Sequence, residues 1–178
     1  MPLRARKIRE CPGALVSTRE ITGEFLLRQH VRVESGGEGF AMQLVVQKRG
    51  DELVLVGLNP IGAVLFTLRQ RGTQIELDSL PPPMLEIPPA NLLRDFHRIR
   101  TLRVVDPAAD GATTSHFGEL EIREVREGGV LRRREFRPVD GLASDGVQLR
   151  FEPGRVSIAN RACDYRAEVV TLSEEPLS

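Results

Sequence analysis

The sequence predicts a mainly β domain of the α+β class: a strongly curved antiparallel sheet of about ten strands with one amphipathic helix against it. Apolar and polar residues alternate through most of the 178 residues, which is the period of a strand with one dry and one wet face. Short turns rich in Gly and Pro separate these runs, as in an antiparallel meander. A sheet of this size closes on itself or wraps a cavity. We therefore expect a half-barrel whose concave face the helix plugs.

The first half of the chain contains five of the expected strands. Residues 1–20 are charged and interrupted by Pro12-Gly13, so we expect a flexible N-terminal segment with at most a short helix around residues 14–20. A single domain is then expected over residues 21–172. Its first strands are expected at residues 23–33, 40–49, 52–58, 63–71 and 73–80. The large apolar residues of these strands that we expect to line the cavity are Phe25, Leu27, Met42, Leu44, Val46 and Phe66.

The turn Asn59-Pro60-Ile61-Gly62 joins two of these apolar strands. Asn-Pro favours turn initiation, Pro60 presets φ, and Gly62 can adopt the positive φ that other residues resist. Ile61 is left at the tip of a short hairpin, where a β-branched apolar residue is a poor choice for contact with water. Two interpretations stay open. The tip tucks under a neighbouring loop, or it is an apolar probe for a membrane or a lipid-bearing partner.

One helix and five further strands follow. Pro88-Pro89 precedes a helical stretch at residues 90–102, in which Leu92, Leu93, Phe96 and Ile99 follow helical spacing. We expect Leu93, Phe96 and Ile99 to face the cavity. After a polar loop at residues 106–115, strands are expected at residues 117–127, 129–139, 146–152, 155–160 and 164–172. Residues 173–178 are expected to form a loose tail.

The run Arg132-Arg133-Arg134 lies on one of these strands. Because neighbouring residues of a strand point to opposite faces, we expect a solvated edge with one inward Arg, which discourages edge pairing. Glu124 and the other carboxylates of the preceding strand are interpreted as outward partners for Arg.

No catalytic or metal-binding motif stands out. The sequence lacks a nucleophile elbow, a Walker loop, His-Glu-x-x-His and Cys-x-x-Cys. Its three histidines fall on different elements, so neither a metal site nor a cofactor is expected. An enzyme would need a polar group inside the cavity, for which Gln29 and His116 are the candidates. Cys11 and Cys163 could pair, but Cys11 lies in an end expected to be mobile, so we expect them to stay unpaired.

Composition excludes some classes of partner. There are 25 basic and 25 acidic residues, no Trp and one Tyr, so we expect no nucleic-acid partner. No run approaches the ~20 apolar residues of a membrane-spanning helix. The basic start is followed by no apolar region, so the printed chain shows no signal peptide and, taken literally, predicts a cytoplasmic protein.

Three features together resemble a known family. They are Leu58-Asn59-Pro60-Ile61-Gly62 leading into a strand, the downstream Gly72, and the helix Asn91-Leu92-Leu93-Arg94-Asp95-Phe96. They resemble the outer-membrane lipoprotein receptor LolB and its LolA/LolB-like relatives, over roughly residues 21–172. Within this group the sequence is most similar to an uncharacterised lipoprotein family often found with aryl-polyene or xanthomonadin-type pigment genes.

The resemblance implies both a fold and a function. It implies a half-barrel with helices as a lid and a hydrophobic cavity for the acyl chains of lipids or lipoproteins. Ile61 matches the protruding apolar residue that helps LolB to deliver lipoprotein into the membrane. The implied location is the periplasmic side of the outer membrane, as a lipoprotein whose signal peptide is missing from this sequence.

Two functional hypotheses follow. In the first, the protein is a non-catalytic, monomeric carrier whose partners are a lipid or acylated lipoprotein, a periplasmic carrier and the membrane surface. In the second, the same half-barrel has a filled core and is an interaction module of a lipid or pigment assembly system. A pocket of a few hundred Å³ favours the carrier, whereas ordinary core packing favours the module.

Overall fold

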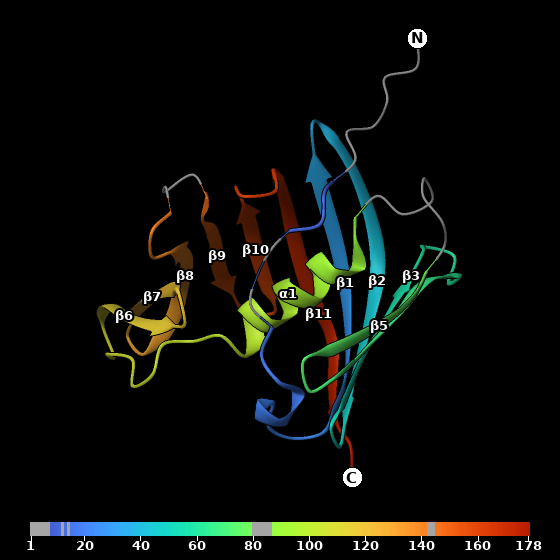
Figure 1. Cartoon of the computed structure of the whole chain (residues 1–178), viewed down its shortest axis with the longest axis horizontal. Coiled ribbons are helices and arrows are strands. Elements are labelled where there is room, and N and C mark those ends of the chain that lie inside the picture. The colour runs from blue at the N-terminus through green and yellow to red at the C-terminus, as the bar shows by residue number, and fades with distance from the viewer. Residues whose placement is uncertain (1–7, 12, 14, 80–86, 142–144) are drawn as a thin grey trace.

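Eleven antiparallel strands form one open sheet, accompanied by helix α1 (Figure 1). The computed structural model describes residues 8–11, 13, 15–79, 87–141 and 145–178. The strands are β1 (Phe25–Ser35), β2 (Glu38–Arg49), β3 (Glu52–Leu58), β4 (Val64–Arg71), β5 (Gln74–Ser79), β6 (Gly111–Phe117), β7 (Leu120–Glu127), β8 (Val130–Pro138), β9 (Val147–Glu152), β10 (Arg155–Asn160) and β11 (Tyr165–Pro176).

The first and last strands meet in the middle of the sheet. The strand order is β5-β4-β3-β2-β1-β11-β10-β9-β8-β7-β6, so two meanders stand side by side. β1 joins them by pairing with β11 from Phe25↔Pro176 to Glu34↔Arg166. The predicted curved antiparallel sheet with a helix is therefore confirmed, with the sheet left open at β5 and β6.

Alternation along the strands gives the sheet one dry face. In β1, Phe25, Leu27, Gln29, Val31 and Val33 are buried, and the residues between them are mostly exposed. β2 and β3 show the same period of two, as expected for strands with one face against a core.

α1 (Pro89–Arg100) lies across the dry face of the sheet (Figure 1). Pro89 stands in the first helical turn, where its missing N–H leaves no hydrogen bond unmade. Leu92, Leu93 and Phe96 are buried, and the Phe96 ring lies 6.4 Å from the Phe25 ring of β1. The predicted helix at residues 90–102 is confirmed to within two residues at its end.

The expected loop and tail are both partly strand. β6 forms within the expected loop at residues 106–115, because β7 supplies a complete antiparallel partner from Gly111↔Arg126 to Phe117↔Leu120. β11 extends through most of the expected loose tail, since residues 173–176 pair with the start of β1. Arg100 of α1 also pairs with Glu174 at 2.6 Å.

The prediction of unpaired cysteines is wrong. Cys11 and Cys163 form a disulfide with their Cα atoms 5.9 Å apart. Cys11 is held in place because its backbone N–H donates to Asn91 Oδ1 of α1 at 2.8 Å. Ile8 and Val16 on either side are buried.

The N-terminal segment also contains a one-turn 3-10 helix, η1 (Thr18–Glu20). Among the described residues, this turn is the helical part of the short helix expected at residues 14–20. The first part of the expected flexible segment, residues 1–7, lies outside the described residues.

Candidate functional site

The predicted cavity-lining residues come together beneath α1. Eight of the nine are buried, and Ile99 is partly buried against the same core: Phe25, Leu27, Met42, Leu44, Val46, Phe66, Leu93, Phe96 and Ile99. Strand and helix spacing therefore predicted that these residues point into the core, and their role as cavity lining stays a prediction.

The space between α1 and the sheet is almost filled. A cavity of about 10 Å³ lies between α1 and strands β1, β2 and β11, and of the nine residues it touches Leu44, Phe96 and Ile99. This is about the volume of one water molecule, far below that of a ligand pocket. In this conformation α1 itself fills the space against the dry face of the sheet.

A buried polar cluster on α1 was not predicted. The Tyr165 hydroxyl of β11 donates to Asp95 Oδ2 at 2.6 Å, and Arg98 Nη1 donates to Asp95 Oδ1 at 2.8 Å. Burial raises the pKa of Asp95, which the Arg98 charge partly opposes, and burial also raises the pKa of Tyr165 well above its usual range. Asp95 and Arg98 stand three residues apart in the sequence, but Tyr165 lies 70 residues further on.

A second polar contact joins α1 to β4. His97 Nε2 lies 2.8 Å from Gln70 Oε1, and Gln70 Nε2 donates to the Val16 carbonyl at 2.8 Å. Burial lowers the pKa of His97 to about 4, so the ring is neutral at pH 7. Since the Gln70 amide oxygen can only accept, His97 Nε2 carries the proton.

Arg134 of β8 holds the end of α1. Its guanidinium contacts the Glu124 carboxylate at 2.8 Å and donates to the carbonyls of Arg98 and Ile99 at 2.7 and 2.9 Å. Arg134 is the one inward Arg that was predicted. The expected solvated edge is wrong, because β8 lies between β7 and β9. The outward placement of Glu124 is also wrong, since Glu124 is buried against Arg134.

The Asn59–Gly62 turn projects from the sheet. The Asn59 side-chain oxygen accepts the backbone N–H groups of Ile61 and Ala63, and Gly62 has φ +88°. Ile61 is 90% exposed and Val64, at the start of β4, is 54% exposed. Of the two interpretations of Ile61, the tip tucked under a loop is therefore wrong.

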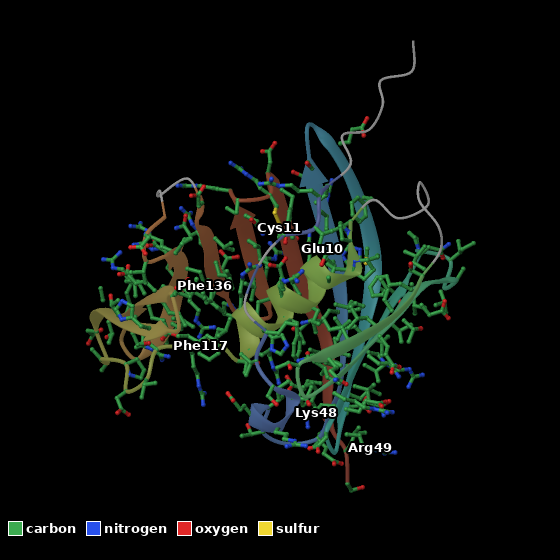
Figure 2. All side chains as sticks on the ribbon, in the orientation of Figure 1. Glu10, Cys11, Lys48, Arg49, Phe117 and Phe136 are labelled. Carbon is green, nitrogen blue, oxygen red and sulfur yellow. A yellow bond between two sulfur atoms is a disulfide. The ribbon has the colours of Figure 1, made fainter. Side chains whose placement is uncertain are left out.

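The N-terminal segment crosses the outer side of α1. Asn91 Nδ2 donates to the Arg9 carbonyl at 2.9 Å, and Glu10 contacts Arg94 at 3.4 Å. Figure 2 labels Glu10 and Cys11 beside α1 and shows the sulfur of Cys11 in yellow. Further along, Thr18 pairs with Gly72 through both its N–H and its hydroxyl.

The face of the sheet turned away from α1 carries a polar hollow. It has a volume of about 1010 Å³ and lies between the β1–β2 hairpin and strands β9 to β11. Ser35 bridges it by donating to the Asp164 carbonyl at 2.8 Å. Its charged lining residues are Arg32, Glu34, Glu38, Arg150, Arg161, Asp164 and Arg166.

The candidates for catalysis do not come together. Gln29 lines the small cavity under α1, whereas His116 lies on exposed β6, 3.9 Å from Glu121. No group of three or more His, Cys, Asp or Glu residues able to hold a metal occurs in the described part of the chain. No described helix is long and apolar enough to span a membrane.

A family model described as a protein of unknown function, DUF3261, matches residues 26–173. The chain belongs to the DUF3261 family. The match includes all eleven strands, except for the ends of β1 and β11, and the whole of α1. Cys163 therefore lies within the DUF3261 match and Cys11 outside it. No curated protein matches the sequence.

Proposed function

We propose that this DUF3261 protein binds the acyl chain of a lipid or lipoprotein without catalysis, between α1 and the dry face of the sheet. The supporting observation is that, in the part of the chain that the structure describes, the 12-residue helix α1 covers the apolar face of an open sheet. Burial of each CH₂ of an acyl chain contributes about 0.8 kcal/mol. The contacts of a bound acyl chain would offset part of the apolar burial that is lost when α1 moves.

Binding requires α1 to move. The cavity of about 10 Å³ beneath α1 has no room for an acyl chain. Displacement would uncover the residues around Phe96, which pack on β1 and β2. The LolA/LolB-like resemblance, in which helices act as the lid, supports the same mechanism.

The exposed Asn59–Gly62 turn would deliver the chain to a membrane. Ile61 and Val64 present apolar surface at the tip of the β3–β4 hairpin. An apolar side chain on a rigid hairpin can enter the interface of a bilayer, where amphipathic elements bury their apolar parts.

The disulfide supports a location outside the cytoplasm. Disulfides persist in oxidising compartments such as the bacterial periplasm and are rare in the cytosol. Cys11–Cys163 therefore supports the proposed location at the periplasmic face of the outer membrane over the literal cytoplasmic prediction.

Native mass spectrometry and uptake of a fluorescent fatty acid test the proposal. We expect the wild type to bind the fatty acid. We expect Ile99→Trp to lose most of the uptake, because its larger ring would take the place of an acyl chain between a displaced α1 and the sheet. Leu172→Trp on the exposed part of β11 is the matched control and should bind as the wild type does. A folded wild type that takes up no fatty acid and carries no lipid, in both its oxidised and its reduced form, would contradict the proposal.

A second candidate function rests on the filled core. Packing beneath α1 leaves a cavity of about 10 Å³ instead of the few hundred Å³ that would favour a preformed carrier site, so this observation favours the interaction module. The polar hollow on the other face offers a surface for a partner. If the wild type binds no acyl chain, and Arg150→Glu with Arg166→Glu abolishes co-purification of a partner, the module is the correct function.

A further inference from the structure

We infer that the described residues of the N-terminal segment, 8–11, 13 and 15–21, act as a strap that holds α1 shut over the sheet, and that the Cys11–Cys163 disulfide is its lock. The inference concerns regulation and rests on the proposed function, because it is the proposed acyl-chain site that the strap would close.

The strap is fastened at Cys11 and at Thr18, and Gly13 between them lies against side chains of α1. One end is bonded covalently to the β10–β11 turn through Cys163. The other end is pinned at Thr18, whose N–H donates to the Gly72 carbonyl at 3.1 Å and whose hydroxyl donates to the Asp51 carbonyl at 2.7 Å. In Figure 1 the dark-blue parts of this segment lie near α1.

Contacts between the strap and α1 are specific and buried. Asn91, a polar residue on α1, is fully buried because its amide bonds to both Arg9 and Cys11 of the strap. A Cβ on Gly13 would lie 2.9 Å from Arg94 Cδ and 3.1 Å from Arg98 Nη2, so the backbone of the strap lies directly on these side chains. The strap thus closes the side of α1 that the sheet does not.

Outward movement of α1 requires the strap to release. Gln70 binds Val16 of the strap and His97 of α1 together, so strap, helix and β4 form one packed unit. With both ends fixed, the strap cannot move away as a whole. Cleavage of the disulfide would free the end nearest Asn91, leaving hydrogen bonds and the Glu10–Arg94 ion pair to hold it.

The lock opens by thiol–disulfide exchange with a dithiol reductant. A thiolate of the reductant attacks one sulfur of the disulfide and forms a mixed disulfide. The second thiol of the reductant, as a thiolate, then attacks this mixed disulfide and releases the cysteine that is still bound to the reductant. Two electrons and two protons pass to Cys11 and Cys163, which become thiols, and the reductant leaves as a disulfide.

Hydrogen exchange of the full chain, with and without dithiothreitol, tests the lock. We expect reduction to speed exchange in α1 and in residues 15–21 roughly tenfold more than in β1 and β2. Cys11→Ser with Cys163→Ser should show the same pattern without reductant. Asn91→Ala, with the disulfide intact, should speed hydrogen exchange in the strap only, and by less than reduction of the disulfide does. Ser35→Ala is the matched control, because it removes a contact to the same β10–β11 turn from the other face.

Two results would overturn the lock. One is unchanged exchange in α1 after reduction. The other is an equal acceleration in α1, β1 and β2, which would make the disulfide a general clamp on the fold. The reductant experiment on folded protein keeps the test valid if the double cysteine variant fails to fold.

Uptake of the fluorescent fatty acid separates the lock from the proposed function. Faster uptake by the reduced protein than by the oxidised protein supports both the lock and acyl-chain binding. A loosened α1 without any uptake supports the lock and contradicts acyl-chain binding. Equal uptake before and after reduction, with α1 exchange unchanged, supports acyl-chain binding and overturns the lock.

Discussion

His97 makes the contact between α1 and β4 sensitive to acid. The pKa of His97 is about 4 in the folded protein, below its ordinary value of 6.5, because the ring is buried and neutral. The unfolded chain therefore binds more protons between these values. The contribution of His97 to the unfolding free energy is fully present above pH 6.5 and is lost as the pH falls toward 4.

We predict that His97 removes about 3 kcal/mol of unfolding free energy between pH 7 and pH 4. His97→Gln keeps a donor for Gln70 and cannot titrate, so its stability should fall less over this range. Urea unfolding of both proteins at pH 7, 5.5 and 4 measures the difference. Equal slopes against pH for the two proteins would refute this role for His97.

Glu124 and Arg134 form a buried ion pair that is shielded from solvent. Arg134 also donates to the carbonyls that end α1. We predict that Glu124→Gln costs about 3–5 kcal/mol, because it leaves the Arg134 charge buried without its partner. Chemical denaturation at pH 7 measures this cost. Glu121→Gln, on the same strand and more exposed, is the control and should change stability by less than about 0.5 kcal/mol.

At the scale of elements, the β3–β4 hairpin gives the clearest test of membrane contact. Ile61 is almost fully exposed, so Ile61→Glu should leave the unfolding free energy within about 0.5 kcal/mol of the wild type. We predict that the same change abolishes transfer of a bound acyl chain to vesicles. Leu172→Glu adds the same charge at another exposed apolar position. Transfer that persists in Ile61→Glu, or that is lost equally in Leu172→Glu, would remove the proposed role of the turn.

The elements that the sequence predicted are those with a strong local period. The alternation in residues 25–33 fixed β1 and its dry face, and the spacing of Leu92, Leu93 and Phe96 fixed α1. β6 was missed because residues 111–117 are mostly small and polar and have no apolar alternation. Its pairing with β7, rather than its own sequence, makes it a strand.

The polar contacts of the site depend on distant residues. His97 and Gln70 lie 27 residues apart, and Tyr165 and Asp95 lie 70 residues apart. Cys11 and Cys163 are separated by 152 residues. No local pattern links such pairs, so the apolar part of the site could be predicted and its polar part could not.

For the whole molecule, we predict that Cys11→Ser with Cys163→Ser lowers the unfolding free energy by about 2–4 kcal/mol, because the disulfide restricts the unfolded chain. Urea unfolding under non-reducing conditions measures this loss. The oxidised and the reduced wild type are the controls. The variant should unfold at about the midpoint of the reduced wild type and below that of the oxidised wild type. A midpoint equal to that of the oxidised protein would contradict the prediction.

The central pairing of β1 with β11 also fixes when the fold can be completed. β1 pairs with β2 on one edge, but its other edge stays unpaired until residues 165–176 are available. The disulfide needs residue 163 as well. The hairpins of β1 to β5 can therefore form first, whereas the two halves of the sheet can join only after residues 165–176 have been added.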